Sequence, residues 1–154
     1  MRLDDRITIE RLPRSHEDEP PKSQILVDGV PTGKHVAGAV LEGAVQWNSF
    51  RVLFTTDDVP FEDQLTIVLL DRDLQELDSA RIGGPYSTGT FSSLTLIEPD
   101  TIQFRFIGDT VWSVRLLSRP QRRIPFLSEP PGVHRRFGFS RHFVVSGDPK
   151  PERS

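Results

Sequence analysis

The chain has 154 residues, 22 acidic and 19 Lys or Arg side chains, a formal net charge of −3 and no cysteine. Its length suits one domain with a single core, and the missing cysteine excludes disulfides, a thiol nucleophile and thiolate metal sites. No stretch approaches the roughly 20 apolar residues that span a bilayer. Residues 1–6 have no apolar core of signal-peptide length, so we expect a soluble, cytoplasmic protein.

The N-terminal part of the chain alternates between short strand patterns and turn signals. Residues 6–12 alternate and predict a strand, whereas residues 13–23 are polar, charged and rich in proline and predict a flexible loop or linker. The Asp-Gly pair at 28–29 predicts a tight hairpin turn. Pro31 and Gly33 are expected to interrupt the chain after this turn.

The middle of the chain predicts strands of two kinds. Residues 36–47 predict a strand close to another backbone, because their glycines tolerate crowding, with a short buried helix as the alternative. Residues 50–54 alternate, whereas residues 64–70 are apolar on both faces and predict a strand central in a sheet. For residues 71–82 we prefer the second strand of a hairpin over a short helix opened by a capping box.

The C-terminal part contains the clearest pattern. Residues 91–97, 101–107 and 110–117 predict three strands joined by turns. Residues 118–132 contain four prolines and predict an extended surface segment rather than a central strand. Residues 133–145 alternate again, and residues 146–154 predict a disordered tail. The side chains of one parity in the last alternating segment, expected to face the core, are Phe137, Phe139, Phe143 and Val145.

These elements predict one all-β, mainly antiparallel domain over residues 1–145. We expect eight to ten short strands, little helix, and either a meander β-sandwich or a small β-barrel. The strand order does not follow from the pattern.

Charge is distributed unevenly along the sequence. Residues 1–100 hold 18 acids and 9 Lys or Arg, whereas residues 101–142 hold 8 Arg and 2 acids. Either the two parts neutralise each other or are simply solvated, or the Arg-rich part binds an anion or an acidic partner. The candidate binding residues of this Arg-rich C-terminal face are Arg119, Arg122, Arg123, Arg135, Arg136 and Arg141.

Other segments match no catalytic or metal-binding pattern. The acids at 57–63 and 71–78 have no EF-hand spacing, and the glycine-rich stretch 83–90 lacks the lysine of a Walker A loop. No GxSxG or HExxH motif occurs. We therefore predict no cofactor and no metal. The four histidines, none of which lies in an HxH arrangement, are His16, His35, His134 and His142.

Three functional hypotheses remain. The first is a non-enzymatic protein-interaction module that binds an acidic protein surface, with a bacterial immunity or assembly-accessory role as an analogy. The second is a small-ligand-binding β-barrel with its mouth near residues 55–63 and 83–90. The third is a hydrolase or metal-dependent enzyme. Nucleic acid is disfavoured, because the sequence pI is about 5.8 and the phenylalanines alternate as core residues do.

Overall fold

The computed structural model describes residues 1–59, 63–83, 89–108, 110–122, 129–135 and 140–147, in which the regular secondary structure is entirely strand. Thirteen strands in these residues form three sheets, and every pairing between them is antiparallel. The predicted all-β antiparallel fold is confirmed. Of the two forms expected, the described strands adopt the layered sandwich and close into no barrel. None of the described segments forms a helix suited in length and hydropathy to crossing a membrane.

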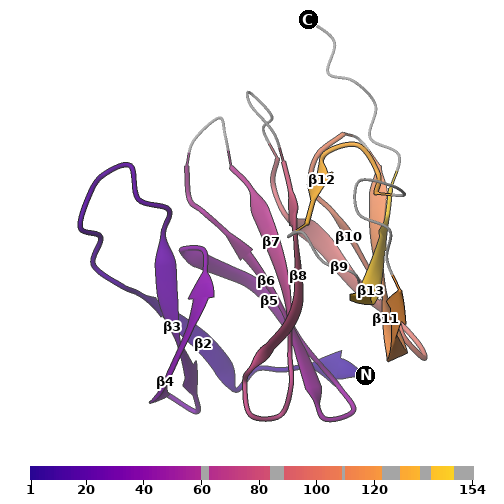
Figure 1. Cartoon of the computed structure of the whole chain (residues 1–154), viewed down its shortest axis with the longest axis horizontal. Helices are drawn as coiled ribbons and strands as arrows, with labels where there is room; N and C mark the ends of the chain where they lie inside the picture. Colours follow the sequence, from indigo (N-terminus) through magenta and orange to yellow (C-terminus); the bar gives the residue numbers. More distant parts are fainter. Residues whose placement is uncertain (60–62, 84–88, 109, 123–128, 136–139, 148–154) are drawn as a thin grey trace, which may run out of the picture.

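The three sheets follow one another along the chain and in space (Figure 1). Sheet B, at the left of the view, has the order β2 (Ile7–Arg11), β3 (Lys22–Val27), β4 (Val30–Ala37). Sheet A, in the middle, has the order β1 (Arg2–Leu3), β5 (Val40–Trp47), β6 (Phe50–Thr56), β7 (Leu65–Leu70), β8 (Glu76–Ile82), β12 (Val133–His134). Sheet C, at the right, has the order β13 (Ser140–Ser146), β11 (Val111–Arg122), β10 (Thr101–Arg105), β9 (Ser92–Ile97).

Sheet A contributes to two separate apolar cores. Phe54 and Ile67 face sheet C and pack with Phe104, whereas Leu53 and Val68 face sheet B and pack with residues such as Ile25. Every residue of β7 is buried, which confirms the central strand predicted from its two apolar faces. The sequence pattern did not reveal that two further sheets cover the two faces.

The predicted hairpins are present. Asp28 and Gly29 both have positive φ, at 51° and 78°, as a two-residue hairpin turn requires. Residues 71–75 connect β7 to β8, so the preferred hairpin is correct. The Asp71 carboxylate accepts hydrogen bonds from the backbone N–H groups of Asp73 and Gln75, and it therefore stabilises a turn rather than a helix start.

Strand boundaries in the N-terminal part differ from the prediction. Pro31 and Gly33 belong to β4, an edge strand where proline is tolerated, and the expected interruption takes the form of a register shift between β3 and β4, within which Gly33 has a φ of +76°. The break comes at Gly38, which has φ of +111° and lies against the Thr55 side chain. Lys22 and Ser23, predicted to end a loop, begin β3.

The segment predicted at 118–132 also needs correction. Residues 118–122 continue β11 and are therefore strand, but β10 pairs only with residues 111–115, so beyond Leu116 this strand pairs with β13 alone. The prediction that the segment is not a central strand holds for these residues. The register between β11 and β13 shifts between Leu116 and Gln121. Pro120 lies within this bulge, where the ladder does not need its missing N–H. Residues 123–128 lie outside the described residues.

The alternating segment predicted at 133–145 is divided between two sheets, because Val133 and His134 form β12, which pairs with β8, whereas Ser140–Ser146 form β13, which pairs with β11. Phe143 and Val145 are buried in the core between sheets A and C. Phe137 and Phe139 lie outside the described residues, as do residues 148–154 of the predicted tail, whereas Ser146 ends β13.

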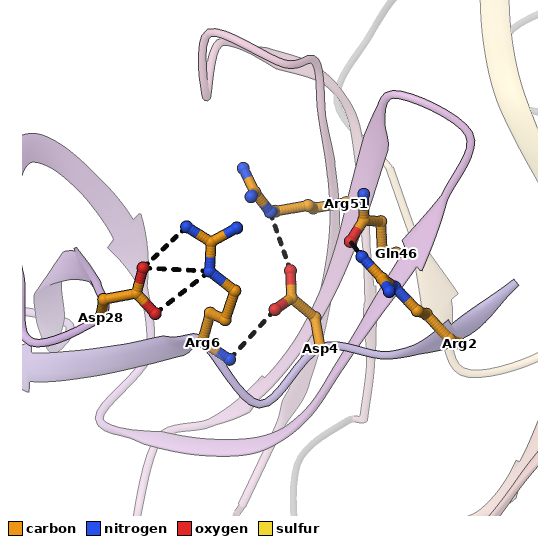
Figure 2. Close-up of polar contacts among 6 residues, drawn as sticks. All are labelled: Arg2, Asp4, Arg6, Asp28, Gln46 and Arg51. Carbon is orange, nitrogen blue, oxygen red and sulfur yellow. Dashed lines mark hydrogen bonds and ion pairs between the residues drawn. The ribbon is translucent and has the colours of Figure 1, made fainter.

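A polar network connects sheets A and B near the N-terminus (Figure 2). Asp4, whose side chain is 2% exposed, accepts hydrogen bonds from Arg51 Nε of β6 at 2.8 Å and from the Arg6 backbone N–H at 3.1 Å. The Arg6 guanidinium in turn binds Asp28 at the β3–β4 turn. These hydrogen bonds lower the pKa of the Asp28 carboxyl. On the other side of Asp4, Arg2 donates to Gln46 of β5.

The two cores make a direct prediction for adjacent residues of β6. Leu53→Ala and Phe54→Ala should each lower the free energy of unfolding by about 2–5 kcal/mol, because each side chain is fully buried in a different core. Urea unfolding of the two variants measures this. A loss below about 1 kcal/mol for either variant would contradict burial of the sheet on both faces.

Candidate functional site

The outward side of sheet C is the structure's candidate binding surface. The register places Ile97, Thr101, Arg115 and Val144 in one row across the four strands. Arg105 pairs with Val111 in another row of the same side. The alternate residues face the core, for example Phe104 and Trp112. Arg122 pairs with Ser140, which has the same parity on β13 as Val144, and therefore joins the outward side. We call this surface the basic face: Arg105, Arg115 and Arg122 with Ile97, Val111 and Val144.

The charge of sheet C has one sign. Strands β9, β10, β11 and β13 contain no Asp, Glu or Lys, and their charged residues are all arginines. Large apolar side chains are exposed among them, since Ile97 is 40% and Val111 is 42% exposed. Arginine enrichment, depletion of Lys, Asp and Glu, and interspersed apolar groups are the composition of the central part of protein–protein interfaces.

The structure separates the arginines predicted as binding residues. Arg122 lies on the basic face, and Arg119 is exposed within the adjacent bulge of β11. Arg141 has the opposite parity on β13, and its guanidinium donates to the Gln121 side chain at 3.0 and 3.1 Å. Arg123 and Arg136 lie outside the described residues.

Arg135 corrects the prediction, because it is not presented on a surface. Its side chain is 1% exposed and lies between two carboxylates, with Nη1 2.8 Å from Asp78 and Nε 3.0 Å from Glu129. Its Nη2 donates to the Phe143 carbonyl at 2.6 Å, and the guanidinium carbon lies 4.4 Å from the centre of the Phe143 ring. Because its partners lie inside the molecule, the Arg135 guanidinium stabilises the fold and is not part of an exposed binding site.

The Arg135 group joins sheet A to sheet C. Asp78 comes from β8, and besides Arg135 it binds the backbone N–H of His142 on β13 at 2.7 Å. His142 lies opposite the bulge, between Arg141 and Phe143, and has no register partner in β11. The carboxylate therefore supplies the acceptor that a regular ladder would otherwise provide.

Two residues of the basic face were absent from the sequence-based site. Arg105 and Arg115 are the outward residues of two strands predicted with the correct alternation. The signal that would have identified them is the lack of any acid in those strands. Alternation would also have placed Arg135 inside, because it shares the parity of the buried Phe143 and Val145.

The acids between 57 and 78 serve the fold in several ways. Asp57 binds Arg81 at 2.8 Å, and its backbone N–H donates to the Asp63 carboxylate at 2.9 Å. Burial raises the pKa of the Asp57 carboxyl, while the charge of Arg81 opposes this shift. Within the described residues, no three His, Asp or Glu side chains are grouped as metal ligands would be. Residues 84–88 of the glycine-rich segment lie outside those residues.

The histidines are distributed over the molecule. His35 is on β4 of sheet B, His134 on β12 of sheet A and His142 on β13 of sheet C. His134 Nε2 is 3.1 Å from the Gly83 carbonyl oxygen. His16 is in the loop between β2 and β3, where its carbonyl accepts a hydrogen bond from the Glu19 N–H.

Comparison of the chain with models of protein families, with curated proteins and with solved structures found no match.

Arg135 should contribute strongly to stability. Arg135→Met should lower the free energy of unfolding by about 3–5 kcal/mol, because it removes a buried cation that lies between two largely buried carboxylates. Arg122→Ala, at an exposed position, should change it by less than about 0.5 kcal/mol. Chemical denaturation compares the two variants, and equal losses would contradict the assignment of Arg135 to the interior.

Asp57 should give a characteristic pH dependence. Because the folded state raises the pKa of this carboxyl above 3.8, its ionisation opposes folding at neutral pH, and that opposition disappears as pH falls. The stability of the wild type relative to Asp57→Asn should therefore rise as the pH falls towards about 4. Urea unfolding of both proteins between pH 7 and 4 measures this difference. A fall towards acid pH would mean that the Arg81 ion pair outweighs burial.

Proposed function

We propose that the protein is a non-enzymatic interaction module whose basic face binds an acidic surface of another protein. The observation that carries this proposal is that four adjacent strands contain no acid and direct Arg105, Arg115 and Arg122 to one side. Arg119 is exposed in the adjacent bulge of β11, between Arg115 and Arg122 in the sequence.

The chemistry of the face favours a protein partner. Guanidinium groups form bidentate interactions with carboxylates. A surface whose charges all have one sign attracts a surface of opposite charge and repels one of like charge. The exposed Ile97 and Val111 supply apolar area that a partner covers. A symmetric dimer through this face is disfavoured, because a two-fold axis would bring together two sets of strands whose charged residues are all arginines. The partner is therefore a different, acidic molecule.

A bacterial immunity or assembly-accessory protein in the cytoplasm would use such a face, and we retain that role within the proposal. The described residues contain no observation of similar weight for a small-ligand site or for catalysis. Several polar side chains considered for those functions bind neighbouring groups of the chain instead, among them Asp57, Asp71 and Asp78.

Charge reversal tests the proposal. The triple variant Arg115→Glu/Arg119→Glu/Arg122→Glu should weaken binding of a partner recovered from source-cell lysate at least tenfold, or about 1.4 kcal/mol or more. The control Arg11→Glu/Lys22→Glu/Arg72→Glu changes the net charge equally at exposed positions outside sheet C, and it should leave the affinity within about threefold. Affinity capture with mass spectrometry identifies the partner, and biolayer interferometry then measures each dissociation constant.

Two outcomes would reject the proposal. Equal loss of binding in both triple variants, with folding intact by circular dichroism, would show a response to net charge rather than to the basic face. Loss of the captured material after nuclease treatment would identify nucleic acid as the ligand, in place of an acidic protein.

A further inference from the structure

The edge strands of the three sheets differ in how well they are protected against pairing with another chain. In sheet B, β2 carries Glu10 and Arg11, and β4 carries Pro31 and Lys34, residues that disfavour strand addition. Sheet A ends on both sides in strands of only two residues, β1 and β12. Charged or proline residues on an edge strand, and edge strands of very short length, are both common features that prevent pairing with another chain.

Sheet C has two different edges. At β13, Asp78 accepts the His142 N–H and Arg135 donates to the Phe143 carbonyl, so side chains from outside the sheet hold this strand. At β9, β10 is the neighbour on one side, and within the described residues no strand pairs with the other side. Strand β9 contains no charged residue and no proline. Of the described edges, β9 therefore has the least protection.

The free edge of β9 is continuous with the basic face. Thr95 and Ile97 of β9 point outward in the rows of Gln103 and Thr101. Leu94 and Leu96 point inward and are partly buried against the core. An added strand would therefore lengthen the surface that carries Arg105 and Arg115.

We propose that the partner of the basic face binds by adding an extended acidic segment to the free edge of β9. This inference rests on the proposed function and specifies its mode of recognition. Backbone groups of β9 would bond the segment over Leu94–Ile97, because Ser93, with φ of +59°, is a bulge that ends the regular ladder. Strand spacing places the added strand about 10 Å from β10 and about 14 Å from β11, so acidic side chains on its outward side lie nearest to Arg105 and one strand farther from Arg115.

The acidic segment suits this edge better than a second copy of β9 does. Two copies paired through β9 would place two basic faces next to each other, and β9 itself offers no carboxylate to either. An acidic segment provides both the backbone ladder and the opposite charge.

A synthetic peptide with alternating acidic residues tests strand addition. The probe is a fluorescein-labelled octapeptide, Glu-Val-Glu-Thr-Glu-Val-Glu-Thr, measured by fluorescence anisotropy with the full chain. Two further peptides carry backbone N-methyl groups at the odd or at the even positions. Because alternate N–H groups of a strand point to opposite sides, one methylated peptide should bind at least tenfold more weakly and the other within threefold of the parent. Hydrogen exchange should slow in β9 when the parent peptide binds.

Each outcome has a defined meaning. If both methylated peptides bind like the parent while Arg115→Glu/Arg119→Glu/Arg122→Glu abolishes binding, strand addition is wrong and the basic face stands. If the triple variant binds the parent peptide unchanged, the proposed function fails together with the inference. Strand addition would also be overturned if the parent peptide showed no binding at 1 mM. The remaining contrary result is a protein that light scattering finds to be a dimer and that Thr95→Pro converts to a monomer, because a second copy would then occupy the β9 edge.

Discussion

The burial of sheet A on both faces is the constraint from which the rest of the architecture follows. Strand β7 has no exposed residue, and its neighbour β6 directs Leu53 and Phe54 into different cores. Such a sheet is stable only if both faces are covered, which requires a layer on each side. Sheets B and C provide those layers.

The order of the layers determines how the uneven charge of the sequence is distributed over the surface of the molecule. The chain completes sheet B, then most of sheet A, then sheet C, with the short strands β1 and β12 as exceptions. The acid-poor segment after residue 100 therefore lies mostly in one outer layer, and the charge difference along the sequence becomes a difference between sides of the molecule. Within this segment Arg135 is the arginine that the fold buries, between Asp78 and Glu129, and it is therefore not part of that outer surface.

Sequence patterning predicted much of the fold. Alternating apolar and polar residues identified the strands β9, β10 and β11 of sheet C, and a continuous apolar run identified the central strand β7. Both patterns are visible in the sequence because a strand buried on one face alternates, whereas a strand buried on both faces is apolar throughout. It did not reveal the third layer, since two-sided burial of a strand does not say what covers each side. Local turn chemistry located the hairpin at Asp28, but it did not show that Pro31 and Pro120 lie within strands, at places where the ladder shifts register and a partner is present on one side alone. The site was predicted less well, because a run of arginines was treated as one surface although successive strand residues point to opposite sides.

The succession of layers has a consequence for how the chain folds. Most strand pairs join strands that are neighbours in sequence. During synthesis, sheet B and most of sheet A emerge from the ribosome before sheet C exists. Until sheet C arrives, Phe54 and Ile67 have no cover from it, so the nascent chain has an apolar surface at that stage. The layer that bears the basic face thus also completes the core, which links formation of the binding surface to the end of folding.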